Sequence, residues 1–181
     1  MSQIVFNAEG FLDPRDFVMT LGEIRQSILV KGPSNEESWD SDWRLILTQN
    51  LEILAKQLWK VGIQNIFIDG SFVEAKAHPN DIDGYFECEL MHLATGALQH
   101  ELNVLDEYKV WTWDGRSRIL DPNSAKKQLP MWHRYRVELY PHYGQPSGIP
   151  DEFGNSMLFP AAFRKSRKEH KPKGIILLKQ N

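Results

Sequence analysis

The sequence predicts an α/β fold (α+β in the wider sense), with a small mixed β-sheet flanked by helices in a single domain over residues 1–181. Helical and strand patterns alternate along the chain, which favours such a sheet. Two short apolar segments, Ile66–Asp69 and Ile82–Cys88, have the length and composition of buried strands. With 181 residues, 41% hydrophobic and 25% charged, the chain is long enough to bury one core without disulfides.

The N-terminal region, residues 1–62, is expected to be mainly helical. Residues 1–19 contain turn residues and no sustained period, so we expect them to be irregular. Thr20 and Glu23 have the spacing of a capping box, which predicts a helix from Thr20 to about Val30.

A second, longer helix is predicted after a polar loop. Asp40 or Ser41 caps its start, and it reaches about Val61 before Gly62 ends it. Its leucines recur at the i, i+4, i+7, i+11 spacing of one buried stripe, formed by Leu47, Leu51, Leu54 and Leu58. This helix is expected to be scaffold.

The core sheet is expected within residues 63–143, and the C-terminal loop and strand within 144–181. Pro130 is expected to end a short helix, and the last strand is expected to join the sheet at an edge. After the two apolar strands we expect, in order, a helix at 97–108 with Leu98, Leu102 and Leu105 on one face, turns at 111–115, the short helix at 123–129, a strand at 132–140, an exposed loop at 144–160 and the final strand at 175–178.

The candidate chemistry lies between the two apolar strands. Gly70 permits a tight turn, and Ser71 offers a hydroxyl and a backbone N–H at the start of the next helix, where a phosphate can bind. Asp81 and Asp83 open the second strand, and residues i and i+2 of a strand point to one face. Because two ionised carboxylates so close repel each other, Mg²⁺ or Mn²⁺ would be stabilising between them.

This arrangement resembles the nucleotidyltransferase superfamily that includes DNA polymerase β. In that superfamily a hydrophobic strand is followed by Gly-Ser or Gly-Gly, a short spacer and Asp-hydrophobic-Asp. The resemblance implies a nucleotidyltransferase-like fold, Mg²⁺ or Mn²⁺ as cofactor and an NTP as substrate. The alternative is a loop and an acidic surface strand in another kind of α/β domain.

Nucleotidyl transfer uses two metal ions, so we expect a third carboxylate on a neighbouring strand. Glu138 is the candidate, because apolar Val137 and Leu139 point to the other face of its strand. The superfamily also places its third carboxylate on a later strand. Asp69 and Asp121 are weaker candidates, and the alternative for Glu138 is a solvent-facing residue of an edge strand.

Cations near these residues are candidates for phosphate binding. Lys76 lies in the crossover and could reach a β- or γ-phosphate as a point charge; the alternative is an ordinary surface lysine. Arg134 and Arg136 are expected on the same strand face as Glu138, where they would either grip the triphosphate or pair with Glu138.

A closer resemblance covers most of the chain. The segment Asp69–Asp83, which reads DGSFVEAKAHPNDID, looks like a family of small bacterial nucleotidyltransferase-like domains of unassigned function whose pattern is DGSFVTxKxxPxDID. The opening at Phe6–Leu12 and a Lys-Gly-Ile-Ile near the end are similar too. Such domains are encoded among mobile elements and in defence or toxin–antitoxin neighbourhoods. Two residues depart from the pattern: Gly84, expected to weaken its strand, and Glu74, which places negative charge near the phosphate site.

Composition excludes several classes. The net charge of −3 argues against a protein that coats nucleic acid, and DNA is not an expected partner, although the basic stretch 164–173 leaves RNA as a third hypothesis. A single cysteine, Cys88, excludes an internal disulfide. No leader or membrane span is evident, so we expect a soluble, cytoplasmic protein. The six histidines lack metal-ligand spacing, and no Ser-His-Asp or Cys-His signature is present.

The leading hypothesis is therefore a metal-dependent nucleotidyltransferase that moves an NMP group, from ATP by default, to a hydroxyl of a protein, an RNA or a small molecule. Asp81, Asp83 and Glu138 would bind the metals, while Gly70 and Ser71 would hold the triphosphate. The alternative is a non-catalytic interaction module with the same fold, such as an antitoxin or a regulatory partner.

Overall fold

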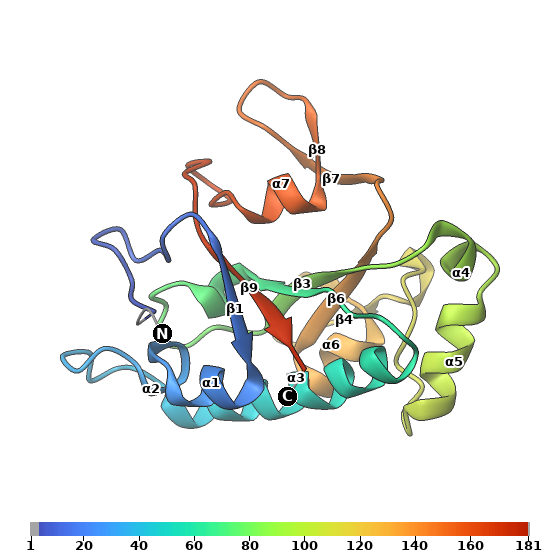
Figure 1. The fold of residues 1–181 in the computed structure, drawn as a ribbon, viewed down its shortest axis with the longest axis horizontal. Coiled ribbons are helices and arrows are strands. Elements are labelled where there is room, and N and C mark those ends of the chain that lie inside the picture. Colours follow the sequence, from blue (N-terminus) through green and yellow to red (C-terminus); the bar gives the residue numbers. More distant parts are fainter. Residues whose placement is uncertain (1–3, 181) are drawn as a thin grey trace.

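The computed structural model describes residues 4–180 and contains a mixed five-stranded sheet of order β1-β9-β2-β3-β6 (Figure 1). Helix α3 packs under one face of the sheet, and α7 with the β7–β8 hairpin lies over the other. The α/β class with a small mixed sheet is confirmed. The elements are β1 (Asp16–Thr20), α1 (Leu21–Gln26), α2 (Ile28–Lys31), α3 (Ser41–Lys60), β2 (Ile66–Asp69), the 3₁₀ helix η1 (Gly70–Val73), β3 (Ile82–Glu87), α4 (Leu90–Ala94), α5 (Ala97–Leu105), η2 (Gly115–Ser117), β4 (Ile119–Leu120), β5 (Lys127–Gln128), α6 (Pro130–Tyr135), β6 (Val137–His142), β7 (Pro146–Pro150), β8 (Ser156–Leu158), α7 (Phe159–Phe163) and β9 (Ile175–Lys179).

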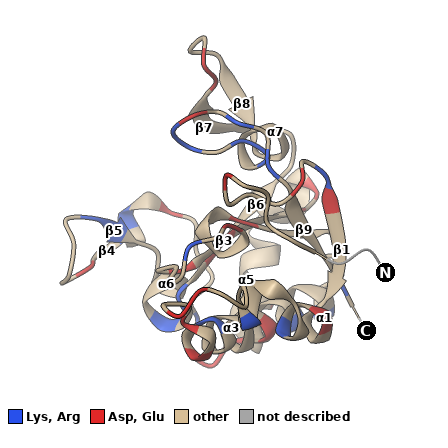
Figure 2. Cartoon of the chain, turned by 90° about the vertical axis from the view of Figure 1, so that its left-hand side faces the viewer, with Lys and Arg blue, Asp and Glu red and all other residues tan. Residues whose placement is uncertain are grey.

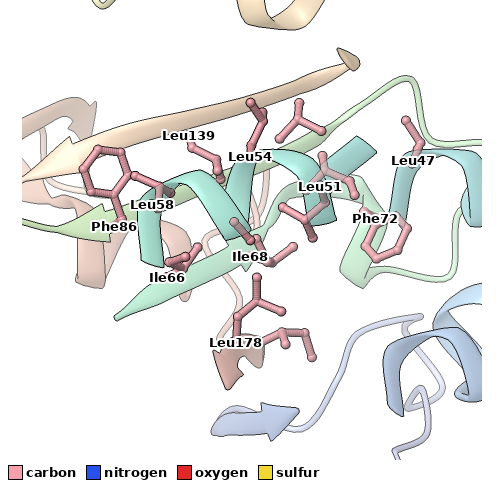
Figure 3. Packing of buried hydrophobic residues seen from close by; sticks show 14 of the residues in the cluster. Leu47, Leu51, Leu54, Leu58, Ile66, Ile68, Phe72, Phe86, Leu139 and Leu178 are labelled. Carbon is pink, nitrogen blue, oxygen red and sulfur yellow. The ribbon is translucent and has the colours of Figure 1, made fainter. Parts of the chain in front are cut away.

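Helix α3 is the scaffold that the sequence predicts. The Asp40 carboxylate caps it by accepting a hydrogen bond from Trp43 N at 2.9 Å. Gly62 follows its end with a φ of +88°, the left-handed conformation that glycine adopts without strain. The four leucines of the predicted stripe are all fully buried and pack against apolar residues of β2, β3, β6 and β9 (Figure 3).

The two faces of the sheet differ because successive strand residues point to opposite sides. Ile66 and Ile68 of β2 belong to the large core against α3, whereas Phe67 belongs to a smaller cluster with Tyr85 and Phe163. Asp69, Asp83 and Glu138 follow the parity of Phe67, so they lie on the face opposite α3.

The N-terminal prediction is wrong at residues 16–20, which form strand β1 instead of irregular structure. β1 pairs in parallel with β9, and β9 pairs on its other side with β2, so the final strand is internal and not at an edge. Neither pairing is local in sequence, and periodicity within a five-residue segment does not reveal it. Residues 1–3 lie outside the described residues.

The predicted first helix is present but divided. Thr20 and Glu23 form the capping box of α1, with Thr20 Oγ1 accepting from Glu23 N at 3.2 Å and Glu23 Oε2 accepting from Thr20 N at 2.7 Å. Ser27 then ends α1 and caps α2, because its hydroxyl accepts a hydrogen bond from Leu29 N.

The prediction for residues 123–140 requires correction. Residues 123–129 are not a helix; they contain strand β5 and part of the turn that joins it to β4 in a two-stranded ribbon. Pro130 begins helix α6 instead of ending one, because its fixed φ suits the first helical turn. Strand β6 consequently starts at Val137, and Arg134 and Arg136 do not share a strand face with Glu138.

Three smaller corrections concern the periphery. Helix α5 ends at Leu105, which is 39% exposed and not part of the buried face. Helix α4 was not predicted, and residues 144–160, expected to be a loop, contain the β7–β8 hairpin. Among the residues that the structure describes, no helix has both the length and the apolar composition to cross a membrane.

Candidate active site

Three carboxylates form a row across adjacent strands. In the sheet register Asp69 of β2 is the partner of Asp83 in β3, and Asp83 is the partner of Glu138 in β6. Asp69 is 6% exposed and Glu138 is 5% exposed, while Asp83 is partly buried. Asp81 lies two residues before Asp83, just ahead of β3, and is also partly buried. The structure therefore brings together Asp81, Asp83 and Glu138, with Asp69 as a fourth member.

Gly70 brings the turn after β2 against this row. Its φ is +73°, and a Cβ placed on it would lie 2.5 Å from Asp83 Oδ2. Only glycine permits this turn, because a side chain would need a strained backbone and would collide with the carboxylate. Ser71 is partly buried in η1, a single 3₁₀ turn. The tight turn is confirmed, whereas the phosphate-binding role of Gly70 and Ser71 stays a prediction.

Gly84 keeps the three strands close and does not weaken β3. A Cβ at this position would lie 2.3 Å from Phe67 O and 2.8 Å from Leu139 Cδ2. Any side chain would therefore push β2 or β6 away from β3. The residue that departs from the superfamily pattern is required for the register that aligns Asp69, Asp83 and Glu138.

Asp83 has the least compensated charge of the row. Burial, followed by the negative charges of Asp81, Asp69 and Glu138, raises its pKa from 3.8 to about 7. Within residues 4–180 no donor makes a hydrogen bond to its carboxylate. The positive charge of Arg167 acts in the opposite direction but is the weakest of these influences. A divalent cation would stabilise the ionised form of Asp83.

Asp81 and Glu138 are each held by donors from the chain around α6 and β6. Asp81 Oδ2 accepts a hydrogen bond from Trp132 Nε1 at 2.7 Å. Glu138 Oε1 accepts from Leu129 N at 2.9 Å, and Glu138 Oε2 accepts from the Tyr140 hydroxyl at 2.5 Å. Each carboxylate oxygen has two acceptor positions, so these bonds fix the carboxylates without using all of their lone pairs.

Asp69 shares with Glu74 a buried lysine that sequence reasoning did not select. Lys173 is 4% exposed, and its Nζ lies 2.8 Å from Asp69 Oδ1 and 2.6 Å from Glu74 Oε1. Burial raises the pKa of Asp69, and Lys173 opposes that shift. Glu74, the second departure from the family pattern, is therefore paired, but the single ammonium balances only one of its two carboxylate partners when both are ionised. The only available signal was the position of Lys173 just before the final strand.

The structure gives other positions to the remaining candidates. Lys76 is exposed, and no described carboxylate pairs with it. Asp121 accepts hydrogen bonds from Asn123 N and Ser124 Oγ at the turn of the β4–β5 ribbon. Arg134 stacks on a tyrosine ring, with 3.7 Å from its guanidinium carbon to the ring centroid. None of these three residues is part of the carboxylate row.

Arg44 fixes the segment that follows the turn, and sequence reasoning missed it. It is fully buried in α3, and its guanidinium donates to Phe72 O at 2.8 Å, Glu74 O at 3.2 Å and Lys76 O at 2.6 Å. Burial without a carboxylate partner lowers its pKa to about 9. Arg44 therefore ties the loop after Gly70 to the scaffold helix.

Charge is unevenly distributed around the row. Figure 2 shows basic residues on the β4–β5 ribbon and on the segment beside α7, with acidic residues between them. Arg118 of the ribbon reaches the row, with its Nη1 3.8 Å from Glu138 Oε1. Among residues 4–180, however, no three His, Cys, Asp or Glu side chains are already positioned around a common metal site. The row is a buried to partly buried group of acidic side chains, and three of its four members have protein partners.

A surface cavity of about 330 Å³ lies at the other end of the sheet, between the end of β9 and the start of β2. It contains no carboxylate and does not offer the chemistry of the acidic row. Its lining residues are Val18, Trp59, Gln64, Asn65, Leu177, Leu178, Lys179 and Gln180.

Comparison with known proteins gives a family but no characterised relative. No protein with curated annotation and no solved structure matches this chain. A family model described as a family of unknown function, DUF6932, matches residues 4–179. Since that match spans nearly the whole sequence, the chain belongs to the DUF6932 family.

Proposed function

We propose that this protein is a metal-dependent nucleotidyltransferase that moves an NMP group from an NTP, by default ATP, to an acceptor hydroxyl. The observation that carries the proposal is the environment of Asp83. Its carboxylate lies in a row with Asp69 and Glu138, directly under the Gly70 turn, and has no hydrogen-bond donor within residues 4–180. A buried, repelled carboxylate beside a glycine turn favours a bound cation over an empty site.

The ligand set fits a hard cation. Asp81, Asp83 and Glu138 supply only oxygen atoms, which Mg²⁺ and Mn²⁺ prefer. Asp69 is excluded from this set because its carboxylate already makes an ion pair with Lys173. When bound, the ion neutralises phosphate charge and lowers the pKa of an attacking hydroxyl.

The chain's own residues would bind the nucleotide around that ion. Gly70 and Ser71 present the backbone of a tight turn, where N–H groups can donate to phosphate oxygens. Arg167, whose charge acts on Asp83, replaces Lys76 as our candidate for the phosphate-binding cation. Glu138, fixed by two hydrogen bonds, is suited to accept the proton of the acceptor hydroxyl.

The test combines Mn²⁺ binding with nucleotide transfer. Asp83→Asn keeps the shape of the side chain under Gly70 but removes its charge. We expect calorimetry to show at least about a tenfold loss of Mn²⁺ affinity, and labelled NTP with Mn²⁺ and cell extract to give no labelled acceptor. Asp121→Asn, in the β4–β5 ribbon, is the matched control and is expected to behave as the wild type. Transfer that survives Asp83→Asn would overturn the mechanism.

A non-catalytic interaction module, such as an antitoxin or a regulatory partner, is the second candidate. It is favoured by the partners that Asp69, Asp81 and Glu138 already have, and by the lack of an assembled metal centre among residues 4–180. Calorimetry that detects neither Mn²⁺ nor NTP binding at millimolar concentrations would favour this function over catalysis.

The biological setting is proposed from the family resemblance, and the acceptor from the charge of the basic stretch 164–173. We propose a cytoplasmic role in a toxin–antitoxin or phage-defence system, with a protein or RNA acceptor. The basic stretch supports RNA less than its composition implies, because most of its cations are already in ion pairs. These pairs are Arg164–Asp16, Lys165–Glu152, Lys171–Glu9 and Lys173–Asp69.

A further inference from the structure

One short segment holds two of the proposed metal ligands. Leu129, the N-cap of α6, donates its backbone N–H to Glu138 Oε1 at 2.9 Å. Trp132, three residues later, donates its indole Nε1–H to Asp81 Oδ2 at 2.7 Å. The two donors therefore come from the N-cap and the first turn of the same short helix, and both reach the acidic row.

Trp132 is itself rigidly held. It is 3% exposed, and its backbone N–H donates to Leu129 O at 3.0 Å. The guanidinium of Arg136 lies 3.8 Å from the centroid of its ring, and Arg136 ends the helix in the left-handed conformation with a φ of 55°. The indole is therefore held at its ring by Arg136 and at its N–H by Asp81.

The same helix end also fixes the backbone next to Asp81. Ile82 N donates to Arg136 O at 2.9 Å, which ties the residue after Asp81 to the end of α6. Asp81 precedes β3 and lacks the support of a strand ladder, so these two bonds to α6 determine its position. The indole bond uses Oδ2, and no described donor contacts Oδ1.

We propose that Trp132 is a positioning residue, which orients the Asp81 carboxylate for a divalent cation through its indole N–H. This inference rests on the proposed function, because it takes Asp81 as a metal ligand. A donor that already holds a metal-binding carboxylate reduces the conformational freedom that the carboxylate loses when the metal binds. Removing such a donor typically lowers metal affinity about ten- to a hundredfold. Trp132 thereby acts on the cation through Asp81 and does not touch it.

The test is Trp132→Phe, which keeps an aromatic ring under Arg136 but lacks the N–H donor. We expect Mn²⁺ affinity, measured by calorimetry, to fall about tenfold. The secondary structure, measured by far-UV circular dichroism, should stay unchanged. Trp111→Phe is the matched control: Trp111 is fully buried and donates its indole N–H to Gln57 Oε1 at 2.6 Å, away from the row. Its Mn²⁺ affinity is expected to equal that of the wild type.

A double-mutant cycle with Asp81→Ala separates positioning from a general structural effect. If Trp132 acts through Asp81, Trp132→Phe has no further effect on Mn²⁺ affinity once Asp81 is alanine. An equal loss in both backgrounds would overturn the proposal. So would a wild-type affinity in Trp132→Phe.

Indole N–H signals in the wild-type protein provide a measurement that does not depend on a variant folding. Titration with diamagnetic Mg²⁺ is expected to shift the Trp132 indole resonance and to leave that of Trp111 in place. An unmoved Trp132 signal at saturating Mg²⁺ would overturn the positioning role alone. A wild-type protein that binds neither Mg²⁺ nor Mn²⁺ would overturn the proposed function, and this inference with it.

Discussion

The two faces of the central sheet are made by the same strands but differ, because the face opposite α3 carries a row of carboxylates beside its smaller apolar cluster. Toward α3, residues such as Ile68, Ile82 and Leu139 are fully buried in one apolar core. On the opposite face, Asp69, Asp83 and Glu138 lie side by side in the sheet register. The first face stabilises the fold by removing apolar surface from water, whereas the second face retains charge that destabilises it. This contrast supports the proposal that the acidic row binds a cationic ligand, because a row of carboxylates without one costs stability.

The largest effect is expected on the apolar face. Leu51 is fully buried in the stripe of α3, and Leu51→Ala would remove buried methyl groups and leave a cavity. We expect a loss of about 3 kcal/mol in the free energy of unfolding, measured by urea denaturation. Ile53, on the same helix but 43% exposed, supplies the control, and Ile53→Ala should cost less than about 1 kcal/mol. Equal losses in the two variants would contradict the assignment of the buried stripe.

The next largest effect is expected from a substitution at Gly84 in β3, which should disturb both faces of the sheet. Gly84→Ala would place a methyl group against Phe67 O and Leu139 Cδ2, so β3 would separate from a neighbouring strand. We expect about 2 kcal/mol of destabilisation together with weaker Mn²⁺ binding, because the register that aligns the carboxylates is disturbed. Gly115→Ala is the control, since a Cβ there meets nothing within 4 Å. A Gly84→Ala protein with wild-type stability would show that the strands are less closely packed than described.

The apolar face was largely predictable from the sequence, because its signals are local. The leucine stripe of α3, the cap at Asp40 and the stop at Gly62 depend on neighbouring residues, and each was confirmed. Strand β2 was also predictable from local signals. So was the face on which Glu138 lies, because its apolar neighbours Val137 and Leu139 point to the core. In these segments local preference and tertiary structure agree.

The acidic face was predicted only in part, because its compensation comes from distant residues. Asp81 and Asp83 lie two residues apart in one motif and can be found from the sequence. Lys173 and Trp132 reach the row only through tertiary packing, which a local sequence pattern does not predict. The misplaced helix at 123–129 had the same effect, since it placed Trp132 in a strand and hid its role. Strand β1 was missed for a related reason: its partner in the sheet, β9, is at the far end of the chain.

A third prediction reverses the sign of the first two. In the folded protein the pKa of Asp83 is raised from 3.8 to about 7, so ionisation is less favourable there than in the unfolded chain. Without metal, the free energy of unfolding is therefore highest below the pKa that Asp83 has in the unfolded chain. It falls as the pH rises toward about 7. Asp83→Asn should remove this dependence and raise stability at pH 8 by on the order of 1 kcal/mol.

Thermal unfolding in EDTA between pH 5 and pH 8 measures this difference, with Asp121→Asn as the control. Asp121 is paired within its own ribbon turn, which lowers its pKa, so its loss should not stabilise the protein. Excess Mn²⁺ should restore the stability of the wild-type protein at pH 8 and leave the stability of Asp83→Asn unchanged. If Asp83→Asn is instead destabilising at pH 8, the carboxylate is compensated, and the contrast between the two faces fails.

The smallest effect concerns the cations around the row. Arg167→Ala removes the charge that acts on Asp83 and should weaken NTP binding about three- to fivefold, as expected for an exposed ionic contact. Lys76→Ala should leave binding unchanged, because the Lys76 charge is not among the influences on Asp83, and its backbone bonds to Glu74 and Arg44 do not depend on the side chain. Calorimetric titration with a non-hydrolysable ATP analogue and Mn²⁺ compares the two variants. If Lys76→Ala has the larger effect, the triphosphate lies along the crossover and not beside the C-terminal segment.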